Sequence, residues 1–328
     1  MKYLNQDATV ERLGQDAKKL LRDRVEKPAG KLVMDGWADC RRDIEAYARG
    51  VWGQHGAHGG PAFAEHAKQR IIRFMDKRLA EYQRDAQRVL GEAKRQAFTM
   101  GYLMSTWILD QTTPPNVKVR PRGDVLSYYR NQGKGRVTEA WAEEPITGQD
   151  GEDGEASGEQ RVSGWLKAWQ LGAVGGLIMA GVQGDTATDV ESRINTATAD
   201  GRDIGDVMGR LIQSEVQIQI AQADSQVFEE HREVTMVRVW ATMEDEGVCD
   251  DCEQQEGKPE AEWKVPMPAH PWCRCWGKMV PLDYQELAGD QGVPGLAKRS
   301  MVFRDPQTGE PAGVVTIEFT SWTQSILD

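Results

Sequence analysis

The chain lacks any long apolar run. Its longest one, Leu171 to Val182, has 12 residues, whereas a helix that crosses a bilayer needs about 20. The first residues, Met1 to Ala17, are polar and charged, so no secretory signal peptide is predicted. We therefore expect a protein without a stable membrane span that is made in a reducing cytoplasm.

Basic residues are scarce relative to acidic ones. The 328 residues include 40 Lys and Arg against 51 Asp and Glu, which gives a formal net charge of -11. A general nucleic-acid coat needs a net basic face, so the charge argues against that class, although a local basic surface stays compatible with it. The sequence also has no P-loop, no Gly-x-Ser-x-Gly elbow and no dinucleotide fingerprint. Its length is sufficient for two domains with cores of their own.

The N-terminal half reads as helical. Residues 1–27 and 32–52 predict two helices that are broken by Pro28-Ala29-Gly30. A long helix is then expected from Pro61, which suits the first helical position, to just before Pro114-Pro115. At about 1.5 Å per residue, some 45 residues would span roughly 70 Å. Apolar side chains recur along it at spacings of three and four and form one stripe: Ile71, Met75, Leu79, Tyr82, Ala86, Val89, Ala93, Ala97, Met100 and Met104. The stripe must be buried against other helices or other copies of the chain.

The second half mixes helices with strands. The Gly-rich run 171–182 predicts a tightly packed, buried helix, with a membrane-active segment as the alternative. Asp203 is placed to cap another helix. Residues 234–241 alternate apolar and polar side chains and predict a strand. Residues 299–303 and 313–320, on either side of a turn, predict a small β appendage.

These elements predict an α+β fold that is mostly α-helical. We divide the chain into a helical N-terminal domain, a linker or exposed loop, a second domain that contains a metal-binding module, and a β appendage. Their predicted ranges are, in that order, 1–113, 114–163, 164–290 with the module at 236–282, and 291–328.

Four of the five cysteines fall in one window of 27 residues (249–275), and only Cys40 stands apart. The window reads Cys249-Asp-Asp-Cys252, then 17 residues, then His270-Pro-Trp-Cys273-Arg-Cys275. In a chain without a secretion signal, such clustering indicates a metal more than disulfides. A Cys-x2-Cys turn brings two thiolates within reach of one ion, and His-x2-Cys does the same from the other side.

Five candidate ligands compete for the four positions of a tetrahedral site. The predicted set is Cys249, Cys252 and Cys273 with either His270 or Cys275. Four protein ligands leave no position for water, which is typical of a structural zinc site and not of a hydrolytic one. We therefore expect one structural Zn²⁺ per chain. Two disulfides or free buried thiols are the alternatives.

The same stretch resembles a known family. The residues Val239-Trp240-Ala241-Thr242, Gly247-Val248-Cys249-x2-Cys252, Gly257-Lys258 and Pro268-Ala269-His270-Pro271-x-Cys273-Arg274-Cys275 resemble the C-terminal motif of the phage Mu-type head morphogenesis family. The His-Pro-x-Cys-Arg-Cys end is specific, because plain zinc ribbons need neither that Pro nor that Arg. The resemblance covers residues 203–282 and, more loosely, 164–202. The chain departs from it at Gln213-Ser214-Glu215, where the family has an Arg-Thr-Glu-like segment.

The resemblance implies a minor head protein, which is a structural protein of the virion and not an enzyme. Such a protein would act in capsid assembly or DNA packaging near the portal vertex, and it would reside in the host cytoplasm during assembly. The implied partners are the portal protein and other capsid proteins, with packaged DNA as a further candidate. The long helix is compatible with docking to these proteins and with self-association.

A zinc-dependent deaminase is one rival interpretation. His231-Arg-Glu233 followed by Cys249-x2-Cys252 is similar to the deaminase signature, in which a Glu activates zinc-bound water. However, Val248 replaces the Pro of that signature, and His270, Cys273 and Cys275 would have no role. The simpler interpretation of His231 is a polar residue at a helix C-terminus, where a partly cationic imidazole suits the helix dipole.

A zinc-ribbon module that binds nucleic acid is the other rival. Basic residues near the cysteines would contact phosphates and tryptophans would stack on bases: Lys264, Arg274 and Lys278, with Trp263, Trp272 and Trp276. Eight acidic residues between Asp245 and Glu262 oppose this role. We expect the tryptophans to shield the metal and to pack against neighbouring residues.

Overall fold

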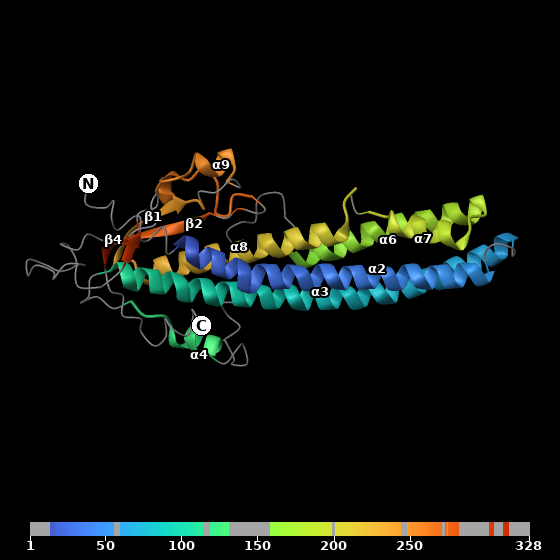
Figure 1. Cartoon of the computed structure of the whole chain (residues 1–328), viewed down its shortest axis with the longest axis horizontal. Helices are drawn as coiled ribbons and strands as arrows, with labels where there is room; N and C mark the ends of the chain where they lie inside the picture. The colour runs from blue at the N-terminus through green and yellow to red at the C-terminus, as the bar shows by residue number, and fades with distance from the viewer. Residues whose placement is uncertain are drawn as a thin grey trace, which may run out of the picture. The chain divides into compact units, whose positions relative to one another are not determined.

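The computed structural model describes residues 14–55, 60–113, 119–130, 158–198, 201–243, 248–270, 273, 275–281, 302–304 and 311–314. Most of these residues are helical, and two small antiparallel sheets of two strands each occur late in the chain (Figure 1). The predicted α+β, mostly α-helical fold class is confirmed. None of the described helices is long and apolar enough to cross a bilayer.

The elements follow one another along the chain with helices first. Residues 14–21 are helical, and the named elements are η1 (Arg22–Glu26), α2 (Lys27–His55), α3 (Gly60–Thr112), α4 (Gly123–Arg130), α6 (Gly158–Gln183), α7 (Ala187–Asn195), α8 (Ile204–Glu230), β1 (Thr235–Ala241), α9 (Asp250–Glu253), η2 (Glu260–Glu262), β2 (Trp276–Pro281), β3 (Val302–Arg304) and β4 (Pro311–Val314).

The chain forms two compact units, each assembled from separated stretches. One unit contains Met1–Val25, Lys94–Pro145 and Val216–Asp328, and the other contains Glu26–Ala93 and Ile146–Glu215. We call them the C-terminal unit and the helical unit. Helices α3 and α8 each contribute residues to both.

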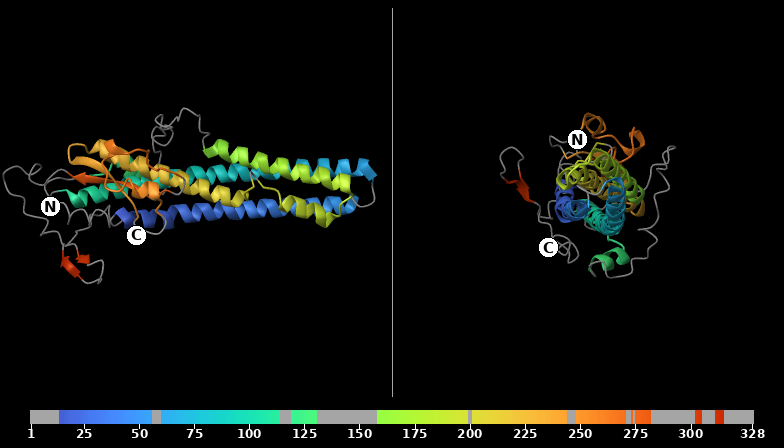
Figure 2. Two further views of the ribbon diagram at one scale, coloured as in Figure 1. Left: turned by 90° about the horizontal axis from the view of Figure 1, so that it is seen from above. Right: turned by 90° about the vertical axis from the view of Figure 1, so that its right-hand side faces the viewer.

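In the helical unit, α2 runs alongside the first part of α3 (Figures 1 and 2). Trp37 on α2 contacts Tyr82 on α3 with ring centroids 5.5 Å apart and Trp169 on α6 at 4.9 Å. The Tyr82 hydroxyl also donates to the Val33 carbonyl at 3.2 Å. One tryptophan on α2 therefore joins three helices that are distant in sequence.

The predicted stripe of the long helix is confirmed. Eight of its ten residues are buried in the structure, and the remaining two, Val89 and Met100, are half-buried. The helix begins at Gly60, has 53 residues and ends at Thr112, where Pro114-Pro115 follows in the sequence. The stripe is thus covered by the chain's own side chains.

The predicted break at Pro28-Ala29-Gly30 is wrong. The helix continues from residue 14 to His55, with a π-helical turn at Arg22–Glu26 directly before the proline. A proline inside an α-helix lacks one N–H and clashes with the carbonyl four residues earlier. The wider π-turn removes the strict four-residue pairing at this point, so the helix passes the proline without ending.

The prediction that α6 is buried is only half right. One side of α6 packs inward through Trp169, Ala173 and Leu177. On the other side, however, Leu171 is 65% exposed and Val182 is 78% exposed. The run is apolar on all sides, so its periodicity gives no sign of which side faces solvent.

The start of α8 follows the predicted cap. The Asp203 carboxylate accepts a hydrogen bond from the Gly205 N–H at 2.7 Å, and the Val207 N–H donates to the Asp203 carbonyl at 3.1 Å. The Gly205 N–H would lack a partner in an uncapped first turn, whereas the Val207 bond is the first backbone bond of the helix itself. Arg41 on α2 pairs with the same carboxylate at 3.0 Å, which anchors the cap within the helical unit.

In the C-terminal unit, the second part of α3 packs closely on the second part of α8. A side chain on Gly101 would place its Cβ 3.3 Å from that of Ala223 and 3.5 Å from the Ile220 backbone, so glycine permits the close approach. The predicted strand at 234–241 is confirmed as β1, which pairs with β2. The predicted β appendage contains the antiparallel pair β3–β4, with bounds that differ from those predicted.

The predicted linker at 114–163 is only partly described. Helix α4 lies within it, and α6 begins inside it at Gly158. Residues 131–157 lie outside the described residues.

Cys40 offers a test of the helical unit. Its side chain is buried, its Sγ donates to the Arg78 carbonyl at 3.6 Å, and burial raises the pKa of the thiol to about 12. Because the thiolate is the reactive form, a rise of about three pKa units lowers its population about a thousandfold. We expect iodoacetamide to leave Cys40 unmodified in the folded protein and to modify it in urea, as measured by peptide mass spectrometry. Equal rates in both states would contradict the buried position.

Candidate metal centre

The cysteine-containing segment is a long loop between two paired strands. In the β1–β2 register, Ala241 lies opposite Trp276 and Trp240 opposite Gly277. The loop therefore leaves the end of β1 and returns directly into β2, one residue after Cys275. Its two ends are held side by side by the strand pairing, which brings the first and last cysteines into one region.

The middle of the loop folds back onto β1. The Trp240 N–H donates to the Lys258 carbonyl, and the Gly257 N–H donates to the Trp240 carbonyl, both at 2.9 Å. Gly257 has a φ of +76°, a left-handed conformation that glycine adopts readily. The Glu256 carboxylate accepts from the Thr242 N–H at 2.7 Å. These bonds fix a loop that has little regular secondary structure.

Each pair of predicted ligands is presented by a backbone turn. The Glu253 N–H donates to the Cys249 carbonyl at 2.9 Å, so the short helix α9 carries Cys252 back toward Cys249. The Cys273 N–H donates to the His270 carbonyl at 3.0 Å and closes the second turn. The Cys-x2-Cys and His-x2-Cys spacings thus work locally as the sequence predicts.

The two turns face one another across a small cluster of donor atoms. His270 Nε2 lies 3.0 Å from Cys249 Sγ and 3.3 Å from Cys252 Sγ. Cys252 Sγ lies 3.7 Å from Cys273 Sγ, close to the roughly 3.8 Å that separates two sulfurs on one tetrahedral zinc with Zn–S of about 2.3 Å. All five predicted ligands are brought together.

The donors fall into two overlapping groups, each with its atoms within 4.8 Å of one another. One group is Cys249, Cys252 and His270, and the other is Cys252, Cys273 and Cys275. Cys252 is the donor that both groups share. The cluster can therefore hold a metal ion, and Cys252 belongs to it whichever of His270 and Cys275 completes the set.

The cluster sits in a core of its own. Cys252, Cys273 and Cys275 are buried together with Trp240, and Val248, Trp263, Val265, Met267 and Ala269 pack against them. Trp240 and Trp263 meet edge to face at 5.1 Å. All four cysteines are free thiols in the structure. Three of the four cysteines are buried and Cys249 is half-buried, which suits a closed structural site better than an open hydrolytic one.

The pKa values of the four cysteine thiols are shifted in different directions. Hydrogen bonding from the Cys275 thiol lowers the pKa of Cys273 to about 5, even though burial opposes this shift. The donated hydrogen bond and burial raise the pKa of Cys275, and burial raises that of Cys252. Burial also acts to raise the pKa of Cys249, but hydrogen bonds from Cys252 and the nearby His270 lower it. The lowered pKa values of Cys273 and Cys249 favour their thiolate forms, and cysteines that bind a metal must be deprotonated.

Among the described residues that the two rival interpretations invoke besides the cysteines, Lys264 is exposed, and all lie outside the two ligand groups. His231 and Glu233 belong to neither ligand group among the described residues, and His231 Nδ1 lies 3.7 Å from Glu233. Trp276 and Lys278 are buried in β2, and Trp263 packs on Trp240, which agrees with a packing role. Pro271, Trp272 and Arg274 lie outside the described residues.

The residue that docks the loop onto α8 cannot be predicted from the sequence. Arg238 on β1 is buried, bonds to the Ser225 hydroxyl on α8 and forms an ion pair with Glu260 of the loop. Its guanidinium also stacks 5.1 Å from the Trp263 ring. In the sequence it is one polar residue of an alternating strand, and no spacing signals its contacts.

A methyl group at Gly277 tests this docking. The Cβ of an alanine there would lie 2.6 Å from Arg238 Cδ and 2.8 Å from Cγ, so the arginine would have to leave its partners. We expect Gly277→Ala to destabilise the protein by about 1–3 kcal/mol in urea unfolding. Gly50→Ala is the control, because Gly50 on α2 has open space around it and alanine favours a helix by about 0.5–1 kcal/mol. Equal effects of the two changes would rule out the docking role.

Comparison with protein families, with curated proteins and with solved structures found no match to this chain.

Proposed function

We propose that the chain is a structural minor head protein of a tailed phage, and that one zinc ion holds its module 236–282 together. The observation that carries the proposal is the convergence of Cys249, Cys252, His270, Cys273 and Cys275 in one cluster, in which Cys252, Cys273 and Cys275 are buried. These are the residues through which the sequence resembles the head morphogenesis family. Thiolates with an imidazole favour zinc over magnesium, calcium or manganese, which prefer oxygen ligands.

The role of the metal would be structural. Among the described residues, the core around the loop between β1 and β2 has three buried cysteines from the loop and the buried Trp240 from β1. The ion would link the two turns of the loop. A closed donor set supplies no site for an activated water. We therefore propose assembly and not catalysis as the function.

The proposed partners are the portal protein and other capsid proteins, with packaged DNA as a further candidate, in the virion near the portal vertex. The exposed apolar side of α6 supports contact with other proteins, because grouped apolar side chains on a surface favour association. Self-association through α3 would have to use its other faces, since the apolar stripe is buried by the chain itself.

The first experiment is elemental analysis of protein purified without chelator, for the intact chain and for Cys249→Ser. About one zinc per chain, lost in the variant together with the proteolytic resistance of residues 248–281, would support the site. Absence of metal in the intact chain would remove its physical basis.

A second experiment addresses the assembly role. The reading frame would be deleted from the phage genome that encodes it, and the lysate examined by electron microscopy for DNA-filled heads. We expect few filled heads, rescue by the intact chain and no rescue by Cys249→Ser. Normal numbers of filled, infectious particles without the chain would exclude an essential role in head assembly.

A further inference from the structure

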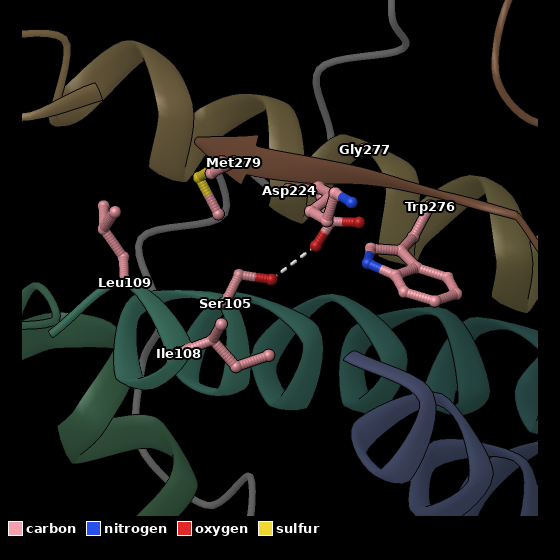
Figure 3. Close-up of a pocket in the computed structure, with 8 residues that line it drawn as sticks. Ser105, Ile108, Leu109, Asp224, Trp276, Gly277 and Met279 are labelled. Atoms are coloured by element: carbon pink, nitrogen blue, oxygen red, sulfur yellow. Dashed lines mark hydrogen bonds between the residues drawn. The ribbon is translucent and has the colours of Figure 1, made fainter. Parts of the chain in front are cut away.

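A buried polar cluster lies in the C-terminal unit outside the metal ligands. Lys18, in the helical stretch 14–21, places its Nζ 3.2 Å from the Asp224 carboxylate on α8, with side chains only 8% and 5% exposed. The Ser105 hydroxyl on α3 donates to the other oxygen of Asp224 (Figure 3). An ammonium group this deeply buried requires a reason, because its desolvation is unfavourable.

The cluster adjoins the metal module. Gly14, one helical turn before Lys18, lies against the indole of Trp276, so closely that an added Cβ would be 2.7 Å from the ring. Trp276 directly follows Cys275. Figure 3 shows Trp276 beside Asp224 and Ser105 at a pocket of about 20 Å³, which has room for one water molecule. The helical stretch 14–21 therefore contacts the first residue of β2, which directly follows the last cysteine.

The pKa of Lys18 depends most on burial, next on Asp224 and least on the thiols. Burial lowers the pKa of Lys18, whereas Asp224 and negative charge on Cys273 and Cys275 raise it. A zinc ion with three thiolates and a neutral imidazole carries a net charge of about -1, and with four thiolates about -2. Buried net charge is stabilised by a nearby opposite charge.

We propose that Lys18 is a positioning residue that neutralises the metal-loaded thiolate cluster, so that zinc binding and the docking of residues 14–21 stabilise each other. The inference rests on the proposed zinc site and adds a partner segment to it. Such coupling is reciprocal: the loaded cluster holds the helical stretch in place, and the docked ammonium tightens zinc binding. Lys278, also buried near Trp276, belongs to β2 and cannot provide this link.

The coupling is tested first on the unaltered chain. Amide hydrogen exchange would be followed for residues 14–21 with zinc bound and after removal of zinc by a chelator. We expect the exchange of these amides to accelerate at least tenfold when zinc is removed, while residues 27–55 of α2 keep their protection. Equal protection of residues 14–21 in both states would overturn the proposal.

Zinc affinity, measured by competition with a chromophoric chelator, tests the charge itself. We expect Lys18→Met to weaken binding about 10- to 100-fold, as changes around metal ligands do, and Lys18→Arg to restore part of it. Lys19→Met is the matched control, because it removes the same charge from an exposed neighbour. The double variant Lys18→Met/Asp224→Asn removes the buried pair together, so a loss of affinity there does not arise from an unpaired Asp224.

The outcomes separate the two proposals. Wild-type affinity in Lys18→Met and in the double variant would overturn the role of Lys18 and leave the zinc site standing. A chain that binds no zinc would overturn the site and the inference together. If Lys18→Met and Lys19→Met weaken zinc binding equally, the effect arises from the net charge of the protein, and the positioning role of Lys18 is overturned.

Discussion

Replacing Cys252 with serine is expected to abolish zinc binding and to unfold the loop of residues 248–281. Cys252 is the donor shared by both ligand groups, and both predicted four-ligand sets include it. A structural zinc contributes about 10–16 kcal/mol of apparent binding free energy in small zinc domains, comparable with the total stability of a folded domain. Metal content, together with hydrogen exchange across residues 248–281, measures both effects.

Three further variants test whether the loss of zinc is specific to the ligands of the cluster. Cys40→Ser should keep about one zinc per chain, because Cys40 lies in the helical unit and outside both ligand groups. His270→Ala and Cys275→Ser should differ from each other, since only one of the two residues is needed to complete four ligands with Cys249, Cys252 and Cys273. Retention of a full zinc equivalent by Cys252→Ser would show that the cluster is held by other means.

The regions that the sequence predicts well are governed by local or periodic rules. The stripe of α3 follows from the helical repeat, the start of α8 from the Asp203 cap, and β1 from alternation. The metal cluster follows from two short spacings, Cys-x2-Cys and His-x2-Cys, because each spacing forms its own turn. Apart from these local turns, the cluster requires one long-range contact, which is the pairing of β1 with β2.

The sequence predicts poorly those regions in which two local structures are similar in free energy. It also predicts poorly those that depend on contacts between residues distant in sequence. The π-turn at Arg22–Glu26 lets a helix pass Pro28, and nothing in the local sequence distinguishes this from a break. The α6 helix is apolar on both sides, so its exposed side is set by packing alone. Lys18 and Asp224 are 206 residues apart, and no periodicity relates them.

Replacing Asp224 with alanine is expected to destabilise the C-terminal unit by about 3–5 kcal/mol, because the change leaves a buried ammonium without its counter-charge. The loss also removes the acceptor of the Ser105 hydroxyl. Urea unfolding at saturating zinc, followed by far-UV circular dichroism, measures the change in free energy. A change below about 0.5 kcal/mol, the size typical of exposed sites, would show that the pair is solvated.

The double replacement Lys18→Met/Asp224→Leu shows whether the buried ion pair contributes to zinc binding or only compensates its own charges. Apolar residues in place of a whole buried ion pair are often neutral or stabilising by about 1–4 kcal/mol, so we expect this variant to unfold at or above the urea concentration of the intact chain. If its stability is kept while its zinc affinity falls, the buried charges serve the metal cluster and not the packing of the helices. If both properties are kept, Lys18 and Asp224 only compensate each other, and residues 14–21 are held in place by apolar contacts such as that of Gly14 with Trp276.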